Sequence, residues 1–166
     1  AYAVGELRYG SPSQITGQRH AHSASSAYSP IPEPPGLTVE PTIDIAAGTK
    51  TLAAGEHLVE SVKVSGKARL KLANASREHP VIVYVRQSVQ FDGNAEIGDA
   101  EDAGKLVVVV LGNGPVKLGG DAMRLVLFAP SADVDIPGSR TVVGSVVGAS
   151  ITVHGSKSSI VHGEDI

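Results

Sequence analysis

The chain has 166 residues and a formal net charge of −3 at pH 7, which suits one domain and argues against a basic surface for nucleic acid. It contains no cysteine, which excludes disulfide bridges, cysteine zinc sites and thiol catalysis. Aromatic residues make up only 4% of the chain, so flat rings that stack on sugars or bases are scarce.

The first 48 residues are irregular in pattern. Two short candidate strands, "AVGELRYG" and "SQITG", are followed by the Ser-, Pro- and His-rich stretch "RHAHSASSAYSPIPEPPG". The prolines between Pro30 and Pro35 favour extended backbone. We expect residues 1–48 to form N-terminal strands and a Pro/Ser-rich strap or cap, or a flexible lead-in, ahead of a second unit at 49–166. The start "AYAVGELRYG" has neither Met nor signal peptide, which we interpret as a mature or excised segment.

From Thr49 onward the pattern changes to short apolar-alternating runs separated by Gly, Asn or Asp. Examples are "HLVESVKVSG", "VIVYVRQSVQFDG" and "MRLVLFAP". Many short strands with turn residues between them predict an all-β fold. The longest apolar run, "LVVVVL", has the length of a strand, so no membrane span is expected in this segment.

One five-residue phrase recurs through this region. It reads "VKVSG" at Val62, "VQFDG" at Val89, "VKLGG" at Val116, "VDIPG" at Val134 and "ITVHG" at Ile151, with steps of 27, 27, 18 and 17 residues. Repeats at near-fixed spacing are typical of solenoids, in which each coil stacks on the one before. We therefore predict a right-handed parallel β-helix (β-solenoid) with short irregular coils, because the strict six-residue period of the left-handed form is absent. The alternative is chance recurrence of a common strand pattern.

The repeat also predicts which side chains hold the coils together. The third residue of each phrase should form an inward ladder of Val64, Phe91, Leu118, Ile136 and Val153. The glycine that ends each phrase should lie where the chain turns, with positive φ. In "GKA", "GNA" and "GDA", which are also 27 residues apart, the alanine should point into a tight corner.

The C-terminal part resembles a known family. The segments "YVRQSVQFDGNAEI", "VKLGGDA", "FAPSADVDIPG", "GSVVGASI" and "IVHGED" are similar to the β-solenoid domain of unknown function found in type IV pilus-associated, PilX-like and pilin-like bacterial surface proteins. The resemblance covers roughly residues 50–166. The chain departs from the family by ending "HGED" and by lacking a hydrophobic pilin helix. The resemblance implies a surface or pilus-linked module and no catalytic residues.

The acidic residues offer little sign of catalysis. Asp92, Asp121, Asp133 and Asp135 are the candidates for a polysaccharide-cleaving site, but Asp121 is offset in its coil from Asp92, so the two are not paired. We interpret them as turn and surface residues. The loop "IGDAEDAG" carries Asp99, Glu101 and Asp102, which is a candidate calcium loop without an EF-hand's glycine and distal Glu. A solvated acidic loop is the preferred interpretation.

The histidines suggest no site either. "HAH" places His20 and His22 on one side of an extended segment, as a metal chelator would, but no third ligand lies near in sequence. His154 and His162 follow strands in two "VHG" phrases and are expected to face outward. The remaining pair are His57 and His79. No G-x-S-x-G, P-loop or G-x-G-x-x-G motif is present.

We therefore expect a non-enzymatic, extracellular β-solenoid module of a pilus-associated or surface protein, with no catalytic, cofactor or metal residues. It would act in display, adhesion or uptake, with pilus proteins, other surface proteins or a surface ligand as partners. The loops 74–79 and 98–104 of the 27-residue coils are the expected contact points. A bactofilin-like polymerising β-helix and a polysaccharide-active enzyme are the alternatives.

Overall fold

The computed structural model describes residues 31–155 and 158–161, together with the backbone of four short N-terminal strands. Its elements are β1 (Tyr2–Ala3), β2 (Leu7–Tyr9), β3 (Gln14–Ile15), β4 (His20–Ala21), β5 (Val39–Glu40), β6 (Ile43–Ile45), β7 (Thr49–Ala53), β8 (Gly55–Val64), β9 (Arg69–Ala73), β10 (Val81–Phe91), β11 (Glu96–Ile97), the 3-10 turn η1 (Ala103–Lys105), β12 (Leu106–Val110), β13 (Val116–Leu118), β14 (Ala122–Ile136), β15 (Thr141–Val153) and β16 (Ser159–Val161). The described part contains no α-helix, so the predicted all-β class is confirmed.

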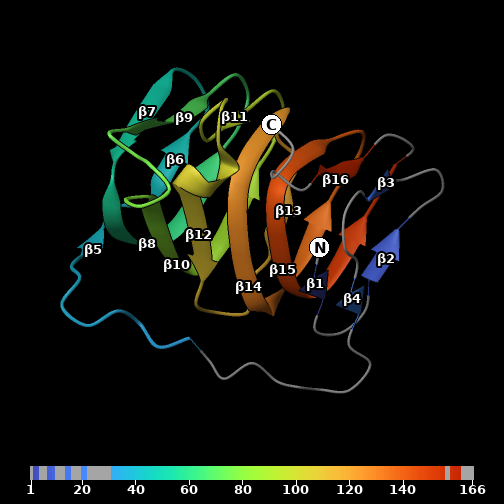
Figure 1. Cartoon of the computed structure of the whole chain (residues 1–166), viewed down its shortest axis with the longest axis horizontal. Coiled ribbons are helices and arrows are strands. Elements are labelled where there is room, and N and C mark those ends of the chain that lie inside the picture. The colour runs from blue at the N-terminus through green and yellow to red at the C-terminus, as the bar shows by residue number, and fades with distance from the viewer. Residues whose placement is uncertain are drawn as a thin grey trace.

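The strands form one sheet in which each strand pairs in parallel with the equivalent strand of the next circuit of the chain (Figure 1). Strand β8 pairs with β10, β10 with β12 and β13, both of these with β14, and β14 with β15. We call one such circuit a coil. Because consecutive coils pair in parallel, each inward-facing residue lies over the equivalent residue of the preceding coil.

The recurring five-residue phrase marks the register in which the coils pair. Val62 pairs with Val89, Val89 with Val116, Val116 with Val134, and Val134 with Ile151. All five are buried, with at most 2% of each residue exposed. The same column continues into β6 at one end and β2 at the other. Chance recurrence is therefore the wrong explanation for the phrase.

The predicted inward ladder is confirmed as core. The side chains in it are each no more than 1% exposed and belong to one continuous apolar cluster: Val64, Phe91, Leu118, Ile136 and Val153. Burying an aliphatic or Phe side chain of this size contributes about 1.5–3 kcal/mol before entropy is counted. The ladder is therefore a main source of stability for the stack.

One step of the predicted register is wrong. Ala68 and Ala95 are fully buried in the corner, as expected. Ala122 is half-buried and pairs with Glu96 instead of stacking on Ala95. The reason is that the turn after Leu118 is one residue shorter than the equivalent turn one coil earlier, so the third alanine is displaced by one position.

The glycines that end the phrases fall into two groups. Positive φ, the conformation that favours glycine, is found at the turns of four copies: Gly66 (63°), Gly93 (70°), Gly138 (68°) and Gly155 (86°). Gly120 was expected to behave likewise and does not. It is buried, and a Cβ there would lie 3.0 Å from the carbonyl oxygen of Ala95, so close packing is what requires glycine at this position.

The two ends of the stack are built from the N-terminal third of the chain. β5 and β6 pair with β8, so this end of the stack includes strands that precede the change of sequence pattern at Thr49. β1 and β2 pair with β15, and β3 pairs with β16, which extends the stack beyond its last long strand (Figure 1). The chain thus passes from one end of the stack to the other between β4 and β5. The division of the chain at residue 48 stays a prediction.

Part of the proline-rich strap is held against the sheet. The Arg86 guanidinium donates to both carboxylate oxygens of Glu33, at 2.8 Å and 2.6 Å, and also to Glu60 at 2.8 Å. Bidentate pairs of this kind fix direction as well as position. Because Glu33 lies among the prolines, the described part of the strap follows the surface of β10.

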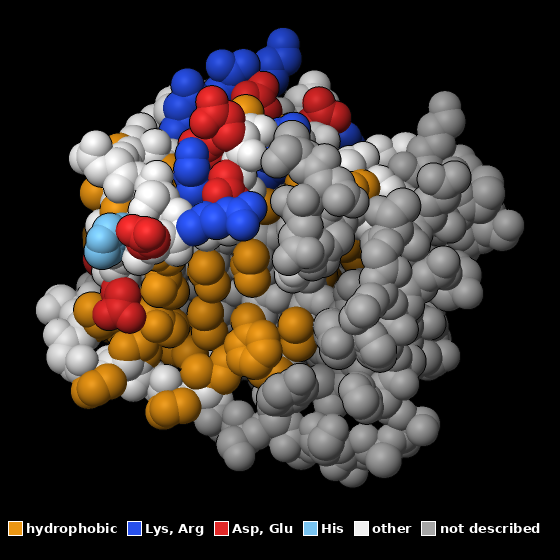
Figure 2. Space-filling model, viewed as in Figure 1, with side chains coloured by type: hydrophobic (Ala, Val, Ile, Leu, Met, Phe, Trp, Pro, Cys, Tyr) orange, Lys and Arg blue, Asp and Glu red, His pale blue; other side chains and the backbone are white. Residues whose placement is uncertain are grey.

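The outer face of the sheet also carries apolar side chains. Tyr84 of β10 pairs with Val109 of β12, which pairs with Phe128 of β14. Figure 2 shows apolar side chains as an orange band across this face, with charged side chains gathered at one edge. The face therefore divides into an apolar part and a charged part.

Replacing Leu118 by Asp is expected to unfold the protein. The side chain is fully buried between neighbouring coils, and an unpaired carboxylate there costs several kcal/mol, comparable with the total stability of a small domain. A thermal melt followed by circular dichroism measures this. Lys117→Gln, a change at a side chain that is 42% exposed on the same strand, is the control. A melt that Leu118→Asp leaves unchanged would contradict the register.

Two turn glycines allow backbone strain to be separated from steric clash. Gly66 and Gly138 have φ of 63° and 68°, but a Cβ on Gly66 would lie 2.4 Å from the Ala46 carbonyl oxygen, whereas nothing lies within 4 Å of one on Gly138. Gly138→Ala should lower the free energy of unfolding by about 1–2 kcal/mol, because left-handed backbone is unfavourable for alanine. Gly66→Ala should lower the free energy of unfolding, measured by urea denaturation, by clearly more than Gly138→Ala does. Equal losses would rule out the close approach at Gly66.

Candidate functional site

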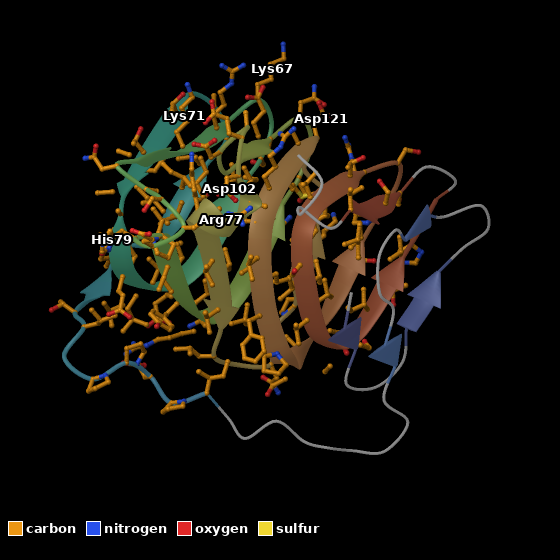
Figure 3. All side chains as sticks on the ribbon, in the orientation of Figure 1. Lys67, Lys71, Arg77, His79, Asp102 and Asp121 are labelled. Carbon is orange, nitrogen blue, oxygen red and sulfur yellow. The ribbon has the colours of Figure 1, made fainter. Side chains whose placement is uncertain are left out.

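Two loops that the sequence singled out lie side by side on one face. The loop 74–79 lies between β9 and β10, and the loop 98–104, which runs into η1, lies between β11 and β12 one coil later. The Nε atom of Arg77 lies 2.7 Å from Oδ2 of Asp102, which links the two loops (Figure 3). Because the Arg77 side chain is 66% exposed, this link lies at the surface and is open to a partner.

Carboxylates of the acidic loop 98–104 stabilise its conformation. Oδ1 of Asp99 accepts a hydrogen bond from the backbone N–H of Glu101 at 2.8 Å, and Oδ1 of Asp102 accepts one from Gly104 at 2.8 Å. The ammonium group of Lys105 lies 3.3 Å from Asp99 and 3.7 Å from Glu101. The loop therefore has a defined conformation and is not merely a solvated acidic run.

These contacts lower the pKa of two carboxyl groups. The pKa of Asp99 falls chiefly because of the Glu101 N–H, with Lys105 adding to the effect. The pKa of Asp102 falls chiefly because of the Arg77 hydrogen bond, with the Gly104 N–H adding to it. Within the described residues, no three His, Asp or Glu side chains come together as a metal site requires. The carboxylates of this loop are paired with cations instead.

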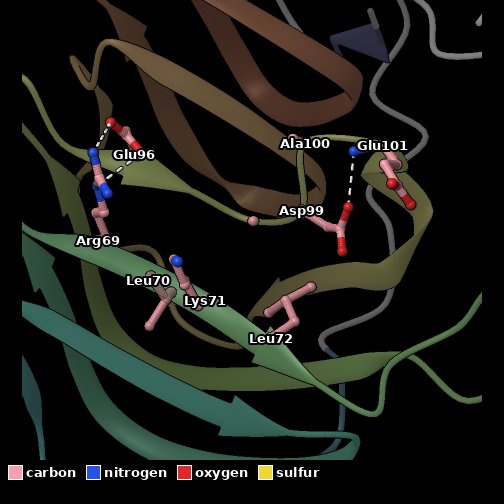
Figure 4. A pocket seen from close by; sticks show the side chains of 9 residues that line it. Arg69, Leu70, Lys71, Leu72, Glu96, Asp99, Ala100 and Glu101 are labelled. Atoms are coloured by element: carbon pink, nitrogen blue, oxygen red, sulfur yellow. Dashed lines mark hydrogen bonds and ion pairs between the residues drawn. The ribbon is translucent and has the colours of Figure 1, made fainter.

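A pocket opens where the acidic loop leaves the sheet. β11 pairs with β9 only through Glu96 with Arg69 and Ile97 with Leu70. Beyond these residues the chain turns away from β9 and leaves a pocket of ≈ 440 Å³ between the strand and the loop. Figure 4 shows Lys71 of β9 pointing into this gap, with Asp99 and Glu101 on the opposite side.

The charges around the pocket are paired, with one exception. Arg69 makes two contacts of 3.0 Å with the carboxylate of Glu96, and Lys105 neutralises Asp99. Among the described residues, Lys71 has no carboxylate within 4.0 Å of its ammonium group. The pocket thus combines satisfied ion pairs with one cation that is free to bind an anion.

The four aspartates considered for catalysis each have a different partner. Their contacts are Asp92 with Lys117 (2.9 Å) and Gln90, Asp121 with Arg140 (3.4 Å), Asp133 with the Ser150 hydroxyl (2.5 Å), and Asp135 with His154 (2.9 Å). Burial raises the pKa of Asp92, but hydrogen bonds from Lys117 and Gln90 outweigh it and leave the pKa below its usual value. No two of the four share a partner in the described structure.

The histidines do not converge in the described residues. Nδ1 of His57 lies 2.9 Å from Glu40 and its Nε2 lies 2.9 Å from the Ala53 carbonyl, so His57 joins β8 to the first coil. His79 closes the loop 74–79 by donating its backbone N–H to the Ser76 hydroxyl at 3.0 Å. The His20 side chain, His22 and His162 lie outside the described residues.

The sequence interpretation missed the cations of this face. Arg69, Lys71, Arg77 and Lys105 were not singled out. A signal was present, because opposite charges face each other when they are one coil apart: Arg69 and Glu96 are 27 residues apart, and Arg77 and Asp102 are 25 apart. Searching for charge pairs at the 27-residue repeat length would have found Arg69 with Glu96, but not Arg77 with Asp102.

Acid is expected to open the loop 98–104 before the stack unfolds. The folded-state pKa of Asp102 lies below its unfolded value, so its contribution is present above about pH 4 and is lost as the pH falls through the folded pKa. Protection of the Gly104 amide, measured as its exchange rate relative to the intrinsic rate at the same pH, should therefore fall below about pH 4. Asp102→Asn should abolish that dependence, and Asp121→Asn should leave it intact. An unchanged profile in Asp102→Asn would contradict the link.

In the described residues no helix is both long and apolar enough to cross a membrane. Comparison with known proteins gives no match among curated proteins or solved structures. One family model does match, and it covers residues 36–166, most of the chain and every coil from β5 onward. The chain therefore belongs to the family described as Domain of unknown function (DUF7305).

Proposed function

We propose that the chain is a non-enzymatic, extracellular module of a type IV pilus-associated or other cell-surface protein, built as a right-handed parallel β-helix. Its role is display, in adhesion or uptake. The observation that carries the proposal is the joined pair of loops 74–79 and 98–104, held on one face of an in-register stack. Binding residues are commonly found on loops that a rigid scaffold positions.

Right-handed coiling is favoured by a general rule for the connections between parallel strands. A strand that returns to pair in parallel with its predecessor does so by a right-handed crossover in nearly all known cases. The coils of this chain also vary in length, with phrase steps of 27, 27, 18 and 17 residues, unlike the uniform six-residue period of left-handed forms.

The non-enzymatic part of the proposal is supported by the arrangement of carboxylates. General acid–base hydrolysis of a glycoside uses two carboxyl groups across one bond, with different pKa values. The described candidates are dispersed over separate contacts, with Asp92 held by Lys117 and Asp135 beside His154. Among the described carboxylates, the polysaccharide-active alternative therefore lacks a pair to perform the reaction.

The polymer alternative is disfavoured by a lysine at one end of the stack. Among the described strands β7 pairs only with β9, and none of them pairs with its other edge. Lys50 of β7 pairs with the buried Leu70 and so occupies an inward position, yet Lys50 is exposed. Inward-pointing charges on edge strands are a known means of preventing edge-to-edge association. A second copy stacked on β7 would have to bury this ammonium group.

Surface location is tested by antibody labelling of intact cells that express the full gene. Labelling without permeabilisation is expected, and protease added outside the cell should remove it. Signal that appears only after permeabilisation would overturn the proposal. A prepilin-type hydrophobic helix encoded immediately upstream of Ala1 would support the pilus form of the proposal over other surface roles.

Assembly is tested by sedimentation velocity and negative-stain microscopy. We expect no filaments from the unaltered chain, and increased self-association for Lys50→Leu, because that change removes the charge from the edge. Lys67→Leu, at an exposed turn residue before β9, is the matched control for added apolar surface. Filaments formed by the unaltered chain would favour the polymer alternative.

A further inference from the structure

The pocket beside β9 exposes polar backbone as well as charge. The carbonyl oxygens of Ala68 and Leu70 accept hydrogen bonds from Glu96 and Gly98 of the next coil, at 3.1 Å and 3.0 Å. Alternate residues of a parallel strand direct their N–H and C=O groups to the same side. Leu72 is the next in this alternation, and the neighbouring chain has already turned away. Its N–H and C=O groups therefore face the pocket.

The side chains around the pocket offer donors and acceptors on opposite walls. Lys71 projects from β9, while the carboxylates of Asp99 and Glu101 line the loop side. Leu72, which is half-buried, adds aliphatic surface at the strand side. Such a lining suits a ligand with several hydroxyl groups and one negative charge. The volume of ≈ 440 Å³ lies within the usual range of small-ligand pockets, roughly 300–1,000 Å³.

The strand side of the pocket continues into a basic rim. Lys67 and Lys71 lie on the same edge of the molecule (Figure 3). Both lysines are exposed, and among the described residues neither has a carboxylate within 4.0 Å of its ammonium group. A ligand that extends out of the pocket along β9 would meet further positive charge.

Other anionic partners fit this geometry less well. A peptide strand would need several residues of free edge, but β9 offers only Leu72 before it ends at Ala73. Nucleic acid bases need aromatic platforms, and no aromatic residue lines the pocket. Sugar hydroxyl groups can use the mixture of carboxylates, ammonium and backbone groups that is present.

We propose that this pocket binds an acidic polysaccharide, with the carboxylate of one uronic acid residue on Lys71, its hydroxyl groups on the loop 98–104 and the backbone of Leu72, and the adjoining sugars along the basic rim. The inference rests on the proposed display function and names the partner of the same face. Without an aromatic platform, each pocket binds weakly, so attachment depends on many copies acting together.

The test is titration of the purified chain with oligouronates, measured by calorimetry or NMR shifts. Neutral oligosaccharides of equal length, inorganic polyphosphate, poly-glutamate and duplex DNA are the comparison ligands. Oligouronate should bind with shifts at Lys71, Leu72 and Gly98–Gly104. Lys71→Gln should weaken binding about tenfold, the value of one charge-assisted hydrogen bond, and Lys71→Arg should retain it. Lys63→Gln, at an exposed lysine of β8, should change nothing.

Three results would overturn the inference. The first is absence of oligouronate binding. The second is equal weakening by Lys71→Gln and Lys63→Gln, which would show diffuse charge attraction. The third is tighter binding of polyphosphate, poly-glutamate or DNA through the same residues. Circular dichroism confirms that each variant folds. Since surface labelling of cells does not depend on this titration, failure here would leave the display function standing with a different partner.

Discussion

Parallel register between consecutive coils is the constraint on which the rest of this molecule depends. Each inward side chain lies over its counterpart one coil away, so the buried part of a column favours the same kind of residue at each step. The column from Val62 to Ile151 is apolar at every step, and the backbone bonds that join the coils follow it. Once the inward columns are set, the outward residues are aligned as well. Arg69 meets Glu96, its partner in register on the next coil.

Variation is confined to the turns between strands. Strand β9 has five residues and β11 only two, so the two neighbours separate after their first pairs. The pocket beside Lys71 is the direct result of that inequality. The loop that forms its far wall owes its conformation to local bonds from Asp99 and Asp102, and to Arg77 of the preceding coil. A repeating core thus supports a feature that occurs once in the described structure, and does so without interrupting the inward columns.

The features that repetition controls were predictable, and the features that depend on turn length were not. The phrase ending in glycine predicted the column pairing and the buried ladder, because packing demands the same residue type at each step. Ala122 was misplaced because a one-residue shortening of a turn leaves no mark in the recurring letters. The Arg77–Asp102 contact was missed for the same reason, since its spacing of 25 differs from the 27 of the phrases. The pocket itself depends on where a strand stops pairing, which alternation of residue types does not specify.

The N-terminal strands have a consequence for the order in which the molecule is made. Tyr2 pairs with Val147, and Gln14 pairs with Ser159, so strands far apart in the sequence are partners in the stack. Contacts this distant in sequence form slowly, because a long loop must close before they add any stability. During synthesis the coils from β5 onward can stack as they emerge, while β1, β2 and β3 still lack their partners in β15 and β16. This end of the stack can therefore form only after β15 and β16 have been synthesised, and a chain truncated before β15 would leave β1, β2 and β3 without these partners.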